Sequence, residues 1–87
     1  MGDIHFKWDL LKNKRLKKVR GVSFEDILDA KLIDIERHPS RELQDRMIFE
    51  WKNYIWVVPF VRTGDEIFLK TIYPSRKHTK YYRRGGQ

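Results

Sequence analysis

The stretch YIWVVPFVRTGDEIFLKTIYPSR, residues 54–76, decides the fold. Two runs rich in β-branched and aromatic residues flank Thr63-Gly64-Asp65, a short glycine-containing connection that is typical of a β-hairpin. Side chains alternate across a strand, so the second arm is expected to place Ile67, Leu69, Thr71 and Tyr73 on one face and Phe68, Lys70 and Ile72 on the other. Both arms carry apolar residues on both faces. We therefore expect part of this hairpin to be covered on both sides.

Proline 59 interrupts the first arm of this hairpin. Proline has no amide donor, so it cannot complete a hydrogen-bonded ladder. The sequence therefore predicts a bulge or an edge position at Pro59.

The remaining segments predict a strand over residues 3–8, a helix over 10–20, a second helix starting at residue 24, and strands over 32–36 and 46–51. Asp9 and Ser23 are the expected N-caps, Gly21 ends the first helix, and Lys52-Asn53 forms a tight turn. Residues 38–41 are expected to form another turn. The predicted fold is α+β, with two N-terminal helices packed on an antiparallel sheet of about four strands. Its order is strand, helix, helix, then three or four strands.

The length of 87 residues predicts a single domain over 1–87 with one modest core. Residues 79–87 form a basic end that is either a last short helix or a frayed tail. The chain has no cysteine, which excludes a disulfide and a thiolate metal site. No cofactor and no metal are predicted. Without a membrane span or a signal-peptide core, the expected location is cytoplasmic.

The net charge of +7 is unevenly distributed along the chain. Residues 1–20 carry +5, residues 21–66 carry −4 and residues 67–87 carry +6. Such segregation favours a polyanionic partner, and neither a lipid motif nor a basic amphipathic helix points to a membrane. The alternative is that the basic ends only keep a small domain soluble.

Three motifs resemble the BrnT-like toxins of the RelE/ParE-like superfamily. They are Phe6-Lys7-Trp8-Asp9 followed by Lys12, then GVSFE at residues 21–25, and the basic strand end Arg76-Lys77. The resemblance spans nearly the whole chain and implies a RelE-like fold in a bacterial type II toxin. It further implies a ribonuclease that inhibits translation and is neutralised by a BrnA-like antitoxin with a ribbon-helix-helix domain. Operator DNA would be reached only through that antitoxin.

The chain departs from the family pattern at two places. The family commonly has asparagine, lysine and histidine near the end of the first helix, where this chain has Leu16, Val19 and Arg20. The leucine side chain cannot form hydrogen bonds. Arginine is always charged and therefore transfers protons poorly. The Ile-Ser-Ala-Arg ending of the family is here YPSR, residues 73–76. A scheme that depends on a histidine at the helix end therefore cannot be carried over.

Metal-independent RNA cleavage needs a base for the 2′-hydroxyl, cations for the charge that develops on phosphorus, and an acid for the leaving oxygen. Arginine binds phosphate through two parallel hydrogen bonds, and this favours arginines among the candidate cations. The proposed catalytic residues are Arg46, Arg76, Lys77, His78 and Glu50, and the proposed RNA-binding residues are Lys12, Arg20, Arg62, Lys70 and Tyr73. For each one the alternative is an ordinary surface or core side chain.

Among the histidines, His78 is the best placed for proton transfer because it follows two cations. We expect the cations of the first helix and of the last strand, Lys12, Arg46 and Arg76 among them, to converge in one pocket.

Three other functions remain open at this point. A non-catalytic nucleic-acid-binding module would use the same basic surface through counterion release. A ParE-like gyrase inhibitor belongs to the same superfamily. A degenerate toxin that survives as an interaction protein would fit the departures at residues 16, 19 and 20.

Overall fold

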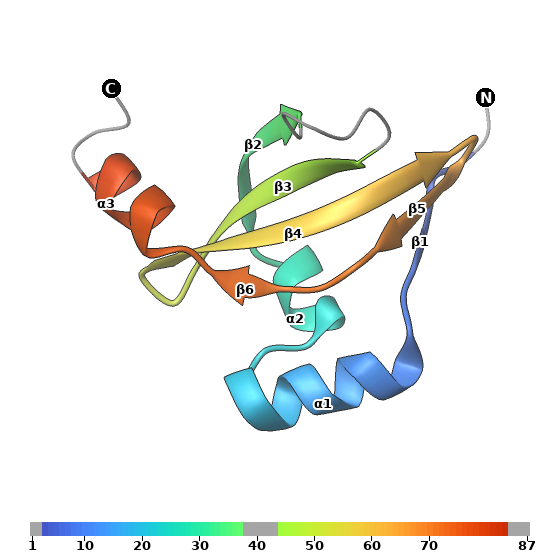
Figure 1. Cartoon of the computed structure of the whole chain (residues 1–87), viewed down its shortest axis with the longest axis horizontal. Helices are drawn as coiled ribbons and strands as arrows, with labels where there is room; N and C mark the ends of the chain where they lie inside the picture. Colours follow the sequence, from blue (N-terminus) through green and yellow to red (C-terminus); the bar gives the residue numbers. More distant parts are fainter. Residues whose placement is uncertain (1–2, 38–43, 84–87) are drawn as a thin grey trace.

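The computed structural model describes residues 3–37 and 44–83, and its strands form a six-stranded sheet (Figure 1). The strand order is β1-β5-β4-β3-β2, and β6 pairs with β4 beside β5. The elements in chain order are β1 His5–Lys7, α1 Leu10–Arg20, α2 Phe24–Leu28, β2 Lys31–Arg37, β3 Gln44–Trp51, β4 Tyr54–Thr63, β5 Glu66–Leu69, β6 Tyr73–Pro74 and α3 Arg76–Arg83. The predicted turn at 38–41 and the end of the predicted tail lie outside the described residues.

The predicted fold, two N-terminal helices on an antiparallel sheet of about four strands, is wrong. The sheet has six strands, it is mixed because β1 pairs in parallel with β5, and the described chain ends in a third helix, α3. The parallel pair joins residues about sixty positions apart, His5 with Glu66 for example. Side-chain alternation indicates that a strand exists but not which partner it pairs with, so this topology was not accessible from the pattern.

Local capping signals form as expected. The Asp9 side chain accepts a hydrogen bond from the Lys12 amide, and Gly21 ends α1 with a positive φ of 74°. Ser23 and Asp26 form a reciprocal capping box at the start of α2. Lys52 and Asn53 both have positive φ, 51° and 62°, in the two-residue turn between β3 and β4.

Two apolar clusters lie on opposite faces of the sheet. The larger one joins Leu16 of α1, and Phe24 and Ile27 of α2, to the sheet residues Met47, Phe49, Val58, Phe60, Ile67 and Leu69. The smaller one contains Ile48, Ile55 and Val57, with Ile33, Tyr73 and Tyr82 of α3 packed against it. Helices α1 and α2 thus cover one face, and α3 covers part of the other (Figure 1). The expected two-sided cover of the central hairpin is confirmed.

The register between the two arms shifts by one residue opposite Pro59, so the predicted irregularity lies in the second arm, but Pro59 is not at an edge. It lies in the central strand β4, directly opposite Arg46, and its carbonyl accepts a hydrogen bond of 2.8 Å from the Lys70 amide. The nitrogen and carbonyl of one residue face the same neighbour in an antiparallel pair, so the missing donor of Pro59 faces the gap between β5 and β6. The second arm is broken at that gap.

The break between β5 and β6 changes which face the following residues occupy. Ile72 is fully buried in the same cluster as Ile67 and Leu69, whereas Tyr73 packs in the cluster on the other face. The predicted unbroken alternation through residue 73 is therefore wrong. The break between β5 and β6 therefore directs Tyr73 toward the face of the sheet that α3 covers.

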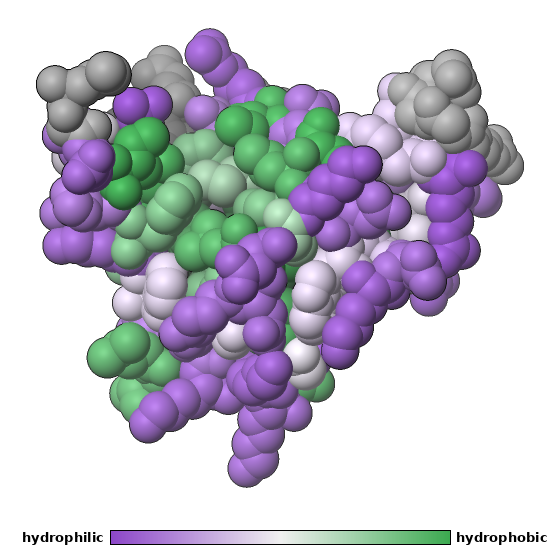
Figure 2. Space-filling model, turned by 180° about the vertical axis from the view of Figure 1, so that it is seen from behind, coloured by the Kyte–Doolittle hydropathy of each residue, from purple (hydrophilic) through white to green (hydrophobic). Residues whose placement is uncertain are grey.

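Some large apolar side chains remain exposed. They include Leu32 and Ile35 on the edge strand β2, and Leu10, Leu11 and Val19 on α1. Seen from behind, hydrophobic residues form a broad area in the upper part of the surface and a smaller group at the lower left, with hydrophilic residues around them (Figure 2). Contiguous exposed apolar surface marks sites of interaction with other proteins. None of the described helices is long and apolar enough to cross a membrane.

The capping box predicts a specific loss of stability in acid. The pKa of Asp26 is lowered from its ordinary value of 3.8, first because Lys17 Nζ donates to the carboxylate at 2.7 Å and next because the Ser23 amide donates to it. A lowered folded-state pKa stabilises the fold above the unfolded value, and this stabilisation is lost as the pH falls through the folded value. We expect Asp26→Asn to be destabilised at neutral pH and to lose less stability than the wild type below about pH 4.

Urea unfolding as a function of pH measures this difference. Asp29→Asn is the matched control, because the Asp29 carboxylate makes no hydrogen bond to any residue that the structure describes. Parallel pH profiles for the wild type and Asp26→Asn would contradict the assignment.

Candidate functional site

Helix α3 is fixed to the central strand by hydrogen bonds at its first turn. The backbone of Ile55 is bonded on both sides: its carbonyl accepts from the Ser75 amide at 2.9 Å, and its amide donates to Thr79 Oγ1 at 2.9 Å. Thr79 Oγ1 in turn donates to the Ser75 carbonyl at 2.7 Å, and Thr79 is only 5% exposed. Three residues thereby set the position of α3 on the sheet.

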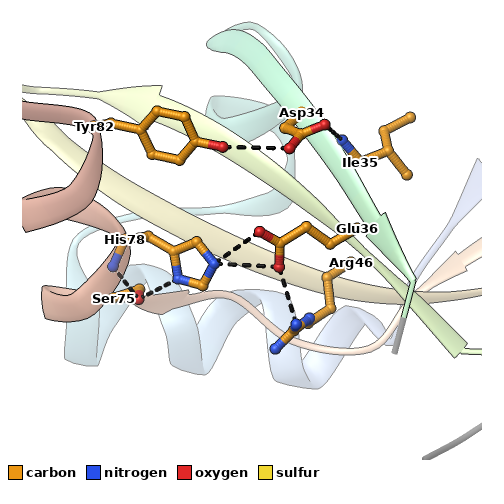
Figure 3. Close-up of polar contacts among 7 residues, drawn as sticks. All are labelled: Asp34, Ile35, Glu36, Arg46, Ser75, His78 and Tyr82. Carbon is orange, nitrogen blue, oxygen red and sulfur yellow. Dashed lines mark hydrogen bonds and ion pairs between the residues drawn. The ribbon is translucent and has the colours of Figure 1, made fainter. Parts of the chain in front are cut away.

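This attachment brings His78 against two neighbouring strands (Figure 3). Its Nε2 lies 3.1 and 3.2 Å from the two carboxylate oxygens of Glu36 on β2, and its Nδ1 lies 2.7 Å from Ser75 Oγ. Arg46 on β3 is paired with Glu36 in the sheet register and donates from Nη2 to Glu36 Oε1 at 2.9 Å. Glu36, Arg46, Ser75 and His78 form what we call the His78 cluster.

The hydrogen bonds determine the tautomer of His78. A carboxylate only accepts, so Nε2 carries a proton and donates to Glu36. In the neutral ring Nδ1 then has the lone pair and accepts from the Ser75 hydroxyl. Ser75 Oγ also accepts from the His78 amide at 3.1 Å, as an N-cap residue does. The imidazole thus presents its basic nitrogen toward a hydroxyl group.

The His78 cluster lines a half-buried depression of about 470 Å³. The side chains of His78, Arg46 and Glu36 are 17%, 24% and 29% exposed. Lys77, Tyr73 and Tyr81 complete the walls. The depression therefore combines two cations, one carboxylate, one imidazole and aromatic surface.

One atom of the His78 cluster is incompletely satisfied. Arg46 Nε is buried and has no hydrogen-bond partner among the described residues. A buried donor without a partner costs free energy, and a bound acceptor that reached it would recover that cost.

A hydrogen bond between Tyr82 and Asp34 lies beside the cluster (Figure 3). The Tyr82 hydroxyl donates to Asp34 Oδ2 at 3.3 Å. Burial raises the pKa of Tyr82, and the negative charge of Asp34 raises it further. The phenol therefore stays protonated and acts as a donor near neutral pH.

The structure brings together some of the residues proposed from sequence and separates others. Arg46, Lys77, His78 and Tyr73 line the depression of the His78 cluster. Arg76 lines a second depression of about 450 Å³ with Tyr54, Lys80 and Arg83. Glu50 lines a third, of about 540 Å³.

The other proposed RNA-binding residues lie elsewhere. Lys12 and Arg20 belong to α1, which covers the face of the sheet opposite to Arg46, and Arg20 donates to the Ile72 carbonyl. Arg62 Nε donates to the Gly64 carbonyl at the hairpin end, and Lys70 Nζ lies 6.0 Å from the centre of the Phe68 ring. The expected convergence of the first helix and the last strand in one pocket is therefore wrong.

Sequence reasoning missed the central member of the cluster, Glu36, and gave no role to Ser75. Glu36 lies two residues after Asp34 in a strand whose alternate residues are Ile33 and Ile35. Two carboxylates at strand spacing place acidic groups on one face, and this signal was available. Their cation and imidazole partners come from distant segments and could not be identified from spacing.

No protein-family model and no curated protein matches the chain. Among solved structures, the fold is similar to the crystal structure of the Brucella abortus ribonuclease toxin BrnT, with a TM-score of 0.54 and 20% sequence identity. The match covers 83% of this chain and 96% of BrnT. The resemblance to BrnT-like toxins inferred from the sequence is confirmed at the level of the fold.

Removing Glu36 should disturb both His78 and Arg46. We expect Glu36→Ala to lower the free energy of unfolding by about 1–3 kcal/mol, because it leaves half-buried donors unpaired. The proton of the neutral His78 ring should no longer be confined to Nε2. Urea unfolding and ¹⁵N NMR of the imidazole measure the two effects.

The matched control is Glu66→Ala. Glu66 pairs with Lys7 at 3.0 Å, but both side chains are more than half exposed. Such exposed pairs add little stability. An unchanged His78 ring spectrum in Glu36→Ala would contradict the positioning role of Glu36.

Proposed function

We propose that the protein is a ribonuclease toxin that cleaves RNA through attack of the 2′-hydroxyl. The observation that carries the proposal is the His78 cluster: an imidazole held by a carboxylate, next to Arg46 and Lys77, in a half-buried depression. The similarity in fold to a ribonuclease toxin supports it.

His78 Nδ1 is the candidate general base. Ser75 Oγ lies 2.7 Å from Nδ1, and its side chain must turn away for a ribose 2′-hydroxyl to replace it at this nitrogen. Transfer of the 2′ proton to Nδ1 lets the 2′-oxygen attack phosphorus. The bond from phosphorus to the 5′-oxygen then breaks, leaving a 2′,3′-cyclic phosphate. Glu36 keeps the other nitrogen protonated and stabilises the positive ring that forms.

The remaining groups supply charge and a proton. Arg46 and Lys77 are the cations for the negative charge that develops on the phosphate oxygens. The leaving 5′-oxygen takes up one proton, for which the hydroxyl groups of Tyr73 and Tyr81 in the same depression are candidates. Every role needed for cleavage is therefore assigned to a side chain of this chain.

We further propose that a cognate antitoxin neutralises the protein, and that RNA cleavage inhibits translation in the bacterial cytoplasm. The exposed apolar residues Leu32 and Ile35 on edge strand β2 support a protein partner, because an open strand edge can be extended by an added strand. The resemblance to BrnT-like toxins suggests a ribbon-helix-helix antitoxin.

Two observations favour a second candidate, a non-catalytic RNA-binding module. Both ring nitrogens of His78 are already hydrogen-bonded, and Ser75 also caps α3. At the departures from the family pattern, Leu16 is buried in the core and Arg20 bonds to a backbone carbonyl. The two candidates differ in whether bound RNA is cut.

Cleavage assays with His78 and Arg46 variants test the proposal. With EDTA present, we expect the wild type to release fragments ending in 2′,3′-cyclic phosphate. His78→Ala should lower the rate about 10²–10⁴-fold, the usual contribution of a general base. Arg46→Ala should lower it about 10²–10³-fold through loss of charge stabilisation.

His5→Ala is the matched control, because His5 lies on edge strand β1 and does not line the depression of the His78 cluster. Full activity of His78→Ala would contradict its role as the base. RNA that the wild type binds with steep salt dependence but leaves intact would establish the binding module instead.

A further inference from the structure

The depression lined by Glu50 lies on the same face of the sheet as the His78 cluster, beside the second turn of α3. Its volume is about 540 Å³, and its lining residues come from five separate segments: Ile33, Glu50, Asn53, Ile55, Thr79, Tyr82 and Arg83. The floor is apolar because Ile55 is buried and Ile33 and Tyr82 pack against it. The rim is polar. We call this depression the Glu50 pocket.

The polar groups of this rim are open to a ligand. Glu50 is exposed and makes no hydrogen bond or ion pair with any residue in the described part of the chain. Arg83 donates from Nη2 to the Asn53 carbonyl at 3.0 Å, which holds the guanidinium at the rim. Glu50 and Arg83 do not pair with each other. The Glu50 pocket therefore offers a free carboxylate and an anchored guanidinium over an apolar floor.

We propose that the Glu50 pocket binds a guanine base of single-stranded RNA. This inference rests on the proposed function. Guanine presents two adjacent donors, N1–H and the 2-amino group, and a carboxylate can accept both at once. Its O6 and N7 are acceptors of the kind that arginine recognises. The other three bases match the Glu50 carboxylate and the Arg83 guanidinium less well. Adenine and cytosine offer a single amino donor, and uracil flanks its N–H with two carbonyls that a carboxylate repels.

The position of the Glu50 pocket relates it to the proposed cleavage site. Glu50 and Arg46 lie four residues apart on β3 and on the same face, which corresponds to about 13 Å at the usual rise of a strand. Tyr82 lines the Glu50 pocket, and its hydrogen bond with Asp34 lies beside the His78 cluster (Figure 3). An extended RNA molecule that places a phosphate at Arg46 can thus place a nearby nucleotide at Glu50. This nucleotide would differ from the one whose phosphate is attacked.

Binding of non-cleavable RNA tests this inference separately from catalysis. The probes are four pentanucleotides with 2′-O-methyl riboses, uridine at the outer positions and one of the four bases at the centre. Fluorescence anisotropy with the full chain should give about tenfold tighter binding for central guanine than for central adenine, as expected for two hydrogen bonds to a charged acceptor. Glu50→Ala should abolish that preference. Glu50→Gln, which keeps one acceptor, should retain part of it.

Asp3→Ala removes the same charge outside the Glu50 pocket and should leave the guanine preference intact. Equal affinity for all four probes, or a guanine preference that survives in Glu50→Ala, would overturn the inference. The same sequences with unmodified riboses report cleavage by the wild type. Intact unmodified RNA together with a Glu50-dependent guanine preference would refute the ribonuclease and leave the guanine site standing.

Discussion

The backbone of Ile55 is the point on which the arrangement of the site depends. Its amide and carbonyl are both bonded to the first turn of α3, through Thr79 Oγ1 and the Ser75 amide. A side-chain hydroxyl thus completes the hydrogen bonding of the central strand where another strand would otherwise be needed. Because this attachment is buried, it fixes the helix rigidly enough to hold His78 within hydrogen-bond distance of Glu36. The Glu50 pocket and the depression of the His78 cluster are both lined by residues of the helix that it anchors.

A single proline explains why the chain reaches that attachment on the correct face. Pro59 has no amide to donate toward the second arm, and the arm is broken opposite it. In an unbroken strand, Tyr73 would share a face with Leu69 and lie under α1 and α2. The break instead places Ile72 in that core and turns Tyr73 to the other face, beside Arg46. The missing donor of Pro59 and the break that turns Tyr73 toward the site therefore lie at the same point of the sheet.

Features set by neighbouring residues could be predicted from the sequence, and those set by distant pairing could not. The caps at Asp9 and Ser23 and the turn at Lys52-Asn53 depend on a few adjacent residues, and they form as expected. The parallel pairing of β1 with β5 depends on contacts about sixty residues apart, and it was missed. The same distinction holds for the site: the cations near His78 were recognised, whereas Glu36 reaches His78 only through folding.

The cations of the protein lie on two opposite faces of the sheet. Those on one face can attract an anion from a distance, and those on the other face can contact it at the candidate site. Helix α1 carries six cations and no acid, but it covers the face opposite to the His78 cluster. Long-range attraction depends on net charge and is felt over about a Debye length, so these cations can attract a polyanion such as the proposed RNA substrate without contacting the His78 cluster. In the proposed mechanism, contact with the reacting phosphate then falls to Arg46 and Lys77, which line the depression of the His78 cluster. If the proposed cleavage occurs, loss of charge on α1 should therefore slow association more than cleavage, and the composition of the chain alone could not distinguish these two roles.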